Sequence, residues 1–448
     1  MGKIYDLIIV GAGPAGLMAA KTAGENGLNV ALLERKVDIV EIKRACCQQL
    51  IGENAPYHAG ELMHFNPRDG RFYFPVNGFS IKYDGPLKNV YSWQFYSSNG
   101  HLVEFGSYEE GRIKGDEGRM NVVFDKKALL RGLLNEARDN SVEVFPEINV
   151  TDVEATAKRV SVIGNGKPFE GAFVIAADGV NSRLARTLDF NKNRKFYGTL
   201  GCFGMHMTGV ELPTPEAQII IMVGRSDNRL PVFYCFTPLA AGDEIDVLIY
   251  AMDAKLDFYA ELEYLMKRSH FSSWFKDPKV VKIARATLNF YSPIPEPFKD
   301  NVLLIGDAAC CGELECSGAL MCGWKAAHSA TVALLESKLC EEGVLSYLEW
   351  WKKGFIERED HEAFVMNFII PYLFADEEIN FLFSLIKEPL PRVQNPYTSP
   401  LFLFEALGKA MPTIEAKRPE VAAKLKRMRT EPLEEIIAPV VKAGFPTK

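Results

Sequence analysis

A glycine-rich turn after an apolar run near the N-terminus constrains the fold more than any other stretch. Leu7–Val10 has the unbroken apolar character of a buried parallel strand, and Gly11, Gly13 and Gly16 follow in GxGxxG spacing. Gly11 permits the turn, Gly13 lets a pyrophosphate approach the backbone, and Gly16 lets the next helix pack closely on the strand. The first turn of that helix offers N–H groups to phosphate. The pattern predicts a Rossmann-like nucleotide-binding unit in an α/β fold.

An acidic residue follows the second predicted strand. Residues 29–33 form another apolar run, which ends at Glu34, and a carboxylate at this place can accept hydrogen bonds from ribose hydroxyls. Because the strand, turn, helix and acid occur together, a glycine-rich turn without a nucleotide is the weaker interpretation. We expect Pro14 and Ala15 of the loop, and Arg35 beside the acid, to belong to the same site.

Two later apolar runs also end in acidic residues. Phe173–Ala176 is followed by Asp178-Gly179, and Val302–Ile305 is followed by Gly306-Asp307. Ligands of open α/β sheets bind beyond the carboxyl ends of the strands, so both strand ends are candidate cofactor contacts. For Asp307 an ordinary helix cap is the alternative.

These three motifs, in this order, resemble the set found in FAD enzymes of the para-hydroxybenzoate hydroxylase fold. The resemblance spans Gly11 to about Leu320 and implies FAD as the cofactor. It implies that Asp307 binds the ribityl chain, that Asp178-Gly179 lies near the pyrophosphate, and that the helix after Asp307 points at the flavin. The backbone N–H groups of Ala319 and Leu320 are expected to face the flavin O2.

The same resemblance implies an α/β fold in which an FAD-binding Rossmann-like domain of the glutathione-reductase type carries an inserted β-sheet substrate domain and a C-terminal helical region. The FAD-binding domain is expected to be discontinuous, and alternating strands separated by turn residues mark the insertion. The expected boundaries are 1–75, 113–189 and 298–335 for the FAD-binding domain, 76–112 and 190–297 for the substrate domain, and 336–448 for the helical region.

A cysteine-containing stretch after the second strand distinguishes among branches of this fold. "IKRACCQQLIGENA" is similar to the segment that the geranylgeranyl reductase family places beside the flavin. This implies that Cys47, and secondarily Cys46, support the chemistry, with Arg44 tuning the thiol; a merely packed thiol is the alternative. Lys126 stands where the family often has an arginine near FAD, and Val150 is expected beside the adenine.

The resemblance implies a reductase that transfers hydride from N5 of reduced flavin to a C=C bond of a prenyl or other apolar substrate, while a nearby acid protonates the other carbon. An FAD-dependent monooxygenase or dehydrogenase of a ring substrate and a non-catalytic flavin electron carrier are the alternatives. His206 and Tyr234 are weaker candidate acids. "LPVFYCFTP" lacks the tryptophan usual for the family, and "YSWQF" at 91–95 is interpreted as an ordinary strand.

Four more cysteines follow the Gly306-Asp307 strand end: Cys310, Cys311, Cys316 and Cys322. Their spacing matches no common zinc site, and no metal is expected. Small apolar lining of the flavin pocket is the favoured interpretation. A redox or proton-donating thiol, its pKa lowered by the start of a helix, and a metal cluster are the alternatives. Cys310 and Leu314 replace a His and a Pro of the hydroxylase motif.

The composition of the chain indicates which kinds of binding partner and which cellular setting to expect. The net charge is −7 and no Lys/Arg-rich block occurs, so nucleic acid is not expected, and no apolar run reaches transmembrane length. The cysteine spacing favours a reducing cytoplasm. The sequence holds one GxGxxG motif, so no separate NAD(P)H-binding domain is expected. An external electron donor, whose kind the sequence does not identify, is expected to reduce the flavin. Residues 414–444 are amphipathic and read as a solvated helical face, with peripheral membrane contact as the alternative.

Overall fold

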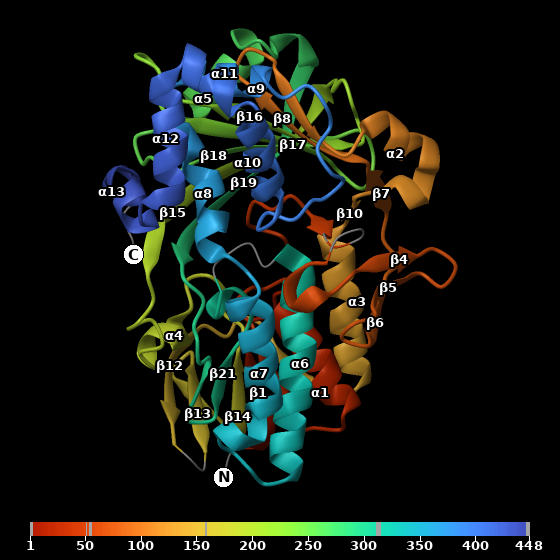
Figure 1. The fold of residues 1–448 in the computed structure, drawn as a ribbon. Coiled ribbons are helices and arrows are strands. Elements are labelled where there is room, and N and C mark those ends of the chain that lie inside the picture. Colours follow the sequence, from red (N-terminus) through yellow and green to blue (C-terminus); the bar gives the residue numbers. More distant parts are fainter. Residues whose placement is uncertain (1–2, 51, 53–55, 157–158, 311–314, 445–448) are drawn as a thin grey trace.

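The computed structural model describes residues 3–50, 52, 56–156, 159–310 and 315–444. A sheet of eight strands in the lower half of Figure 1 forms the first layer, with the parallel order β11-β2-β1-β14-β21 at its centre. Its strands are β1 (Ile4–Val10), β2 (Val30–Leu33), β11 (Glu143–Phe145), β12 (Val150–Ala155), β13 (Val160–Gly164), β14 (Lys167–Ala176), β20 (Phe298–Lys299) and β21 (Val302–Leu304).

Three helices pack on one face of this sheet and lie side by side in Figure 1: α1 (Pro14–Glu25), α3 (Lys126–Asp139) and α6 (Glu315–Leu335). α1 begins at Pro14, whose fixed φ suits the first helical position. A Cβ atom on Gly16 would lie 1.8 Å from the Gly11 carbonyl oxygen, so only glycine permits this close packing of helix on strand. The predicted strand, turn and helix are confirmed.

A second sheet of seven described strands occupies the upper half of Figure 1, in the order β19-β15-β18-β17-β16-β8-β9. Alternate residues face its two sides, and one side packs on α5 (Phe258–Lys267). Its strands are β8 (Ser92–Ser97), β9 (Leu102–Phe105), β15 (Phe196–Val210), β16 (Ala217–Val223), β17 (Val232–Pro238), β18 (Ile245–Ala251) and β19 (Phe275–Tyr291).

The C-terminal region is helical, as expected, and covers the other side of the seven-stranded sheet (Figure 1). Val421 and Leu425 pack against the sheet, and Ile436 and Val440 pack beside β15. The apolar face of residues 414–444 is therefore buried within the protein and is not available to a membrane. The helices are α7 (Leu345–Trp351), α8 (His361–Leu373), α9 (Asp376–Ser384), α10 (Ser399–Lys409), α11 (Met411–Lys417), α12 (Pro419–Thr430) and α13 (Leu433–Ala443).

Two small three-stranded sheets connect the layers. β6 pairs with β5 and β7 pairs with β10, so these two strands of the expected substrate domain join neither large sheet. The remaining elements are β3 (Gln49–Leu50), β4 (His64–Asn66), β5 (Arg71–Phe74), β6 (Phe79–Lys82), β7 (Leu87–Val90), β10 (Asn121–Phe124), α2 (Tyr108–Lys114) and α4 (Arg183–Thr187).

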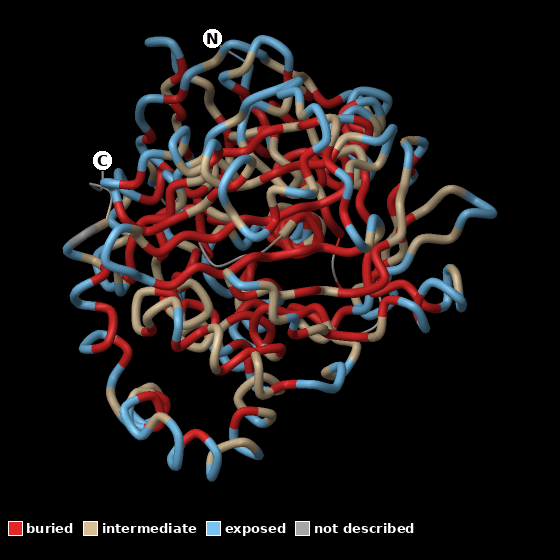
Figure 2. The backbone as a smooth tube through the Cα atoms, turned by 90° about the horizontal axis from the view of Figure 1, so that it is seen from above, coloured by how far each residue is buried: buried red, intermediate tan, exposed pale blue. Residues whose placement is uncertain are grey.

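Figure 2 views the molecule from above and shows buried backbone running through its middle, with exposed segments around the rim. The largest hydrophobic cluster lies between the eight-stranded sheet and its helices, and separate clusters lie on the two sides of the seven-stranded sheet. Within the described residues, no helix is both long enough and apolar enough to cross a membrane.

Candidate functional site

One cavity of about 1050 Å³ connects the two large sheets. We call the part beside the glycine-rich loop the nucleotide end, and the part between the seven-stranded sheet and the C-terminal helices the chamber. The cavity brings together almost all site residues predicted from the sequence: Gly11, Gly13, Pro14, Ala15, Glu34, Arg35, Arg44, Cys46, Cys47, Lys126, Val150, Asp178, Gly179, Gly306, Asp307 and Ala319.

The geometry of the glycine-rich loop fits a pyrophosphate. Gly11 adopts φ of +98°, and a Cβ atom there would lie 2.4 Å from the Ala177 carbonyl oxygen. At Gly13, by contrast, a Cβ atom would meet nothing within 4 Å. Gly13 faces the cavity, so the space that a side chain would fill is the space that a phosphate needs.

Glu34 braces the loop as well as facing the cavity. Its Oε2 accepts a hydrogen bond from Ala12 N at 2.7 Å, and its Oε1 accepts one from Lys36 N at 2.9 Å. The side chain is buried, so these bonds fix the carboxylate in place. Each carboxylate oxygen can accept more than one hydrogen bond, and the arrangement leaves acceptor capacity for a ribose hydroxyl.

Asp178 supplies a second acceptor at the nucleotide end. Its Oδ2 accepts hydrogen bonds from the backbone N–H groups of Arg183 at 2.8 Å and Leu184 at 3.3 Å, whereas Oδ1 is buried without a hydrogen-bond partner. Burial raises the pKa of Asp178. Arg183, which sequence reasoning missed, donates to the Val150 carbonyl at 2.9 Å and lines the same cavity. An orphaned buried oxygen at this strand end fits a donor from the cofactor.

Charged groups converge beneath the expected position of the flavin. Burial raises the pKa of Asp307, and Arg44 and Lys126 act against that rise. Burial lowers the pKa of Lys126, but Cys46, Cys316 and Asp307 outweigh it, so the pKa lies above its ordinary value. Lys126 is therefore a cation at neutral pH. Its Nζ donates to Cys46 Sγ at 3.4 Å.

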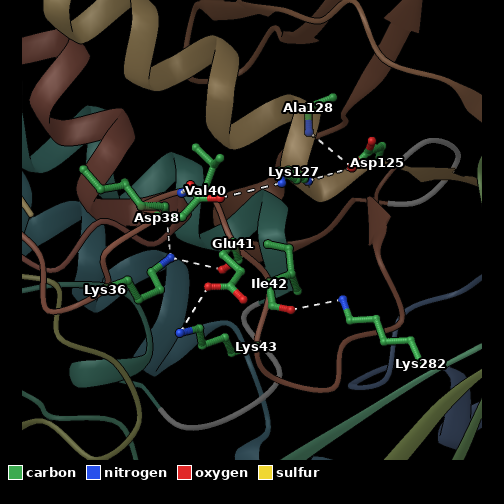
Figure 3. Close-up of polar contacts among 11 residues, drawn as sticks. Lys36, Asp38, Val40, Glu41, Ile42, Lys43, Asp125, Lys127, Ala128 and Lys282 are labelled. Carbon is green, nitrogen blue, oxygen red and sulfur yellow. Dashed lines mark hydrogen bonds and ion pairs between the residues drawn. The ribbon is translucent and has the colours of Figure 1, made fainter.

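A web of polar contacts fixes the segment that leads to the cysteines (Figure 3). Lys36 Nζ donates to the carbonyls of Ile39 and Glu41, and Lys282 Nζ donates to the Ile42 carbonyl at 3.1 Å. Lys127, at the start of α3, lies 3.7 Å from Asp38. The segment is thereby held against both α3 and strand β19 of the upper sheet.

The cysteine pair itself is tied to the start of α3. Gln48 adopts φ of +52°, in the left-handed region, and its Oε1 accepts a hydrogen bond from Lys126 N at 3.1 Å. A bulky residue in this conformation is strained, and such strain gathers at functional sites. Cys46 and Cys47 both line the cavity, at the junction of the nucleotide end and the chamber.

The pKa values of two cysteines after Asp307 differ from one of the alternatives that the sequence offered. Burial raises the pKa of both Cys316 and Cys322 to about 12, so the proposed lowering by the start of α6 is wrong. Desolvation of the thiolate outweighs the helix dipole here. Cys310 is buried in the core, whereas Cys311 and Leu314 lie outside the described residues. Among the described residues, no three His, Cys, Asp or Glu side chains gather as a candidate metal site.

Two predicted contacts do not reach the cavity. Gly16 packs against Gly11 within the loop, and Leu320 is fully buried in the core. α6 begins at Glu315, so the backbone N–H of Leu320 bonds within the helix, and residues 315–317 carry the N–H groups that lack intrahelical partners. The predicted flavin contact of the Leu320 N–H is therefore wrong, and Ala319, whose N–H is likewise within the helix, lines the cavity only as a wall.

The chamber is the part of the site that the sequence did not reveal. "YSWQF" is a strand, as predicted, yet Trp93 and Phe95 of β8 line the chamber, together with Phe233 of β17 and Phe364 and Phe368 of α8. The alternation of side chains along β8 predicts that Trp93 and Phe95 share one face of the sheet. It does not tell whether that face meets a cavity or an ordinary core.

The two weaker candidate acids lie elsewhere. Tyr234 Oη donates to Glu261 Oε2 and accepts from Arg229 on the α5 side of the sheet, and burial raises its pKa. His206 Nδ1 lies 3.9 Å from Glu244 and is not among the cavity-lining residues. Neither is placed to protonate a substrate in the chamber.

Comparison with known proteins agrees with this geometry. The family model described as "Pyridine nucleotide-disulphide oxidoreductase" matches residues 5–196. A digeranylgeranylglycerophospholipid reductase from Methanococcoides burtonii is 23% identical over 86% of this chain and 88% of its own length. The corresponding protein of Methanocaldococcus jannaschii is 24% identical over 87% of this chain and 92% of its own length. Over most of its length the chain is thus similar to geranylgeranyl-type reductases, and it is an FAD-dependent oxidoreductase.

Solved structures show the same fold. A geranylgeranyl bacteriochlorophyll reductase-like protein from Thermoplasma acidophilum has a TM-score of 0.66 and 16% identity, and the match covers 95% of this chain and 99% of that chain. A variant of the halogenase PltM in complex with FAD has a TM-score of 0.60 and 13% identity, with 98% of this chain and 95% of that chain covered. The matched family model and the FAD-bound structural neighbour, together with the cavity, give FAD as the cofactor of this oxidoreductase.

Proposed function

We propose that the protein is an FAD-dependent reductase that adds hydrogen across C=C bonds of a prenyl or other apolar lipid. The observation that carries this proposal is the continuous cavity, which leads from the glycine-rich loop past the cysteine pair into the apolar chamber. The names of the relatives, which are reductases of a digeranylgeranyl lipid, support the same substrate class.

In this proposal the glycine-rich loop, Glu34 and Asp178 would hold FAD, and Asp307 would bind its ribityl chain. Bound reduced flavin supplies a hydride to one carbon of the double bond. The chain must then supply a proton to the other carbon. Cys46 and Cys47 are the candidate donors because both line the junction where the two parts of the cavity meet.

Lys126 can support proton donation by the cysteine pair. Its ammonium group lies 3.4 Å from Cys46 Sγ and stays protonated at neutral pH, so it can stabilise the thiolate that remains when Cys46 gives its proton to the substrate. This contact makes Cys46 at least as strong a candidate as Cys47. The expected domain boundaries and the assigned cofactor contacts belong to the same proposal.

An anaerobic turnover experiment tests the proposed function. The purified flavoprotein, reduced chemically with dithionite, is mixed under nitrogen with a geranylgeranyl lipid, and the product is analysed by mass spectrometry. We expect a mass gain of two hydrogen atoms per reduced double bond, with flavin reoxidised in proportion. Reoxidation that requires air and yields an oxygenated product would instead identify a monooxygenase.

The electron donor and the cellular setting are also proposals. An external reductant must reduce the flavin, because the sequence holds one GxGxxG motif. We infer a cytoplasmic location from the cysteine spacing, with peripheral contact to a membrane from which an apolar lipid is taken. Such contact requires a surface other than the buried faces of α12 and α13. Co-sedimentation with phospholipid vesicles tests it, and recovery of all protein in the supernatant contradicts it.

A further inference from the structure

Four neutral amide side chains meet in the interior where the layers of the protein join. Gln49 comes from β3, Asn121 from β10, Gln218 from β16, and Gln394 from the segment between α9 and α10. They are 1%, 0%, 6% and 4% exposed, so the group, which we call the amide cluster, is buried. Segments separated by more than 300 residues in sequence thus contribute to one polar site.

Gln394 is the hub of the amide cluster. Its Nε2 donates to Gln49 Oε1 at 3.1 Å and to Gln218 Oε1 at 2.5 Å, and its Oε1 accepts from Asn121 Nδ2. The amide N–H groups of Gln218 form only weak hydrogen bonds. Gln218 Nε2 donates to Cys235 Sγ and Thr237 Oγ1, and both distances are 3.5 Å.

Two polar atoms of the amide cluster have no hydrogen-bond partner: Gln49 Nε2 and Asn121 Oδ1. Leaving a buried donor unsatisfied is unfavourable, and native proteins rarely do so without a ligand or water to fill the place. An unsatisfied amide N–H group requires an acceptor, which means an oxygen atom in most biological ligands.

The amide cluster faces the cavity close to the cysteine pair. Gln49, Gln218 and Gln394 all line the cavity, and Gln49 is two residues from Cys47. The described lining residues of the seven-stranded sheet and of segment 364–403 include no charged side chain. A neutral oxygen would gain hydrogen bonds from the amide groups here without bringing a charge into the interior.

We propose that the amide cluster is a binding site for a neutral oxygen atom, a carbonyl or hydroxyl, carried by an otherwise apolar substrate. The inference rests on the proposed reductase function and narrows its substrate class. The amide N–H groups hold the oxygen, and the adjoining hydrocarbon extends into the chamber, which sets one double bond beside the cysteine pair.

Matched substrates test the proposal. Geranylgeraniol and the hydrocarbon that lacks only its hydroxyl are compared as substrates of the FAD-loaded, chemically reduced enzyme. We expect kcat/KM for the alcohol to exceed that for the hydrocarbon by about tenfold or more, because the site leaves an N–H group unsatisfied when the oxygen is missing.

The variant Gln49→Met removes the unsatisfied N–H group at similar side-chain size. It should reduce the preference for the alcohol over the hydrocarbon to about one. Gln94→Met is the matched control, because Gln94 is also a buried amide. It lies on β8 of the seven-stranded sheet, and its hydrogen bonds to Glu104 and Thr214 lie outside the cavity. The control variant should keep the preference. Equal loss on both substrates in Gln49→Met, or no preference in the parent, would overturn the inference.

Binding measurements separate this inference from the proposed function. Equilibrium dialysis of labelled geranylgeraniol against the oxidised protein requires no turnover. If the alcohol binds in a Gln49-dependent manner but no double bond is reduced, the site stands and the reductase function fails. If alkenes are reduced at equal rates with and without an oxygen, the reductase function stands and the amide site fails.

Discussion

At the nucleotide end of the cavity the site residues come in short runs at strand ends, whereas in the chamber they come singly from strands and helices far apart in the sequence. The nucleotide end is charged: Glu34, Arg44, Lys126, Asp178 and Asp307 all line it. The described lining of the chamber carries no charge and is rich in aromatic side chains. One end is thus suited to a fixed polar cofactor, and the other to an apolar molecule held mainly by shape.

This difference predicts that the two ends can be disabled separately. The nucleotide end depends on backbone approach and on fixed polar contacts, so a single added side chain should abolish cofactor binding. The chamber depends on open volume, so an added side chain should exclude substrates by their length and leave the cofactor in place. The predictions that follow test this separation.

The largest effect is expected from Gly13→Val. A Cβ atom at this position meets no protein atom within 4 Å, so the branched side chain should fold without strain and project into the space for the pyrophosphate. The purified variant should be colourless, with no flavin in its absorption spectrum. Gly408→Val is the control, because Gly408 has equally open surroundings on the exposed side of α10. A yellow Gly13→Val protein with normal flavin content would contradict the assignment.

The same difference explains which parts could be predicted from the sequence. The GxGxxG loop, Glu34 and the two acidic strand ends are local patterns, and each one appears where it was expected, around a single cavity. Their positions follow from the rule that ligands bind beyond the carboxyl ends of parallel strands. The helix after Asp307 was placed one turn inaccurately, because Ala319 and Leu320 lie within α6, which begins at Glu315.

The chamber could not be predicted in the same way. Trp93 and Phe95 lie on a strand whose alternation is equally compatible with an ordinary core, and Gln394 belongs to a segment without a recognisable motif. Which residues share a cavity depends on the packing of α8 to α10 over the sheet, and this packing is a tertiary property. The raised pKa of Cys316 was missed for the same reason, since burial is not visible in the sequence.

The next effect tests the chamber. Leu248 on β18 lines the cavity, and the ideal Cβ position of Gly204 on the neighbouring strand is 2.8 Å from Leu248 Cδ2. Leu248→Trp should fill the chamber near the cysteine pair, keep the FAD content, and lower kcat/KM for a long prenyl lipid by about a hundredfold, the cost of misplacing a substrate by roughly 1 Å.

Two comparisons make that result specific. Ile249→Leu changes the adjacent side chain, which faces the α5 side of the sheet, at constant volume and should turn over normally. A short prenyl substrate should lose less activity than a long one in Leu248→Trp. Loss of flavin from this variant would show that the two ends are not separable.

A smaller effect is expected at the junction. Cys46→Ser should lower the rate of alkene reduction by about tenfold, the scale of losing a positioned proton donor, and Cys47→Ser should do so if Cys47 is the donor. FAD content and thermal stability should change little in both. Lys126→Met should match the Cys46 variant in rate if the ammonium group stabilises the thiolate that Cys46 leaves. If neither serine variant slows turnover, the cysteines only pack, and the proton comes from another group.

The smallest effect concerns an acid on the upper sheet. Asp246 on β18 is buried, its Oδ2 has no hydrogen-bond partner, and burial raises its pKa to about 8 although Lys282 acts against the rise. In the unfolded chain an aspartate loses its proton near pH 4. Between about pH 4 and pH 8 the folded protein therefore holds one more proton than the unfolded chain, and the free energy of unfolding falls as the pH rises. The neutral character of the chamber's sheet thus extends to an acid on the face of β18 that carries Leu248.

Asp246→Asn removes this titration and keeps the shape of the side chain. Because the amide never ionises, the variant should gain stability relative to the parent as the pH rises, with the gain reaching its full size near pH 8 and staying constant above it. Thermal unfolding between pH 5 and pH 9 measures the difference in melting temperature, which should grow from pH 5 to about pH 8 and then stay constant up to pH 9. If the difference in melting temperature between Asp246→Asn and the parent is the same at every pH, Asp246 is already ionised in the folded protein. The sheet that lines the chamber would then tolerate a charge, as the nucleotide end does.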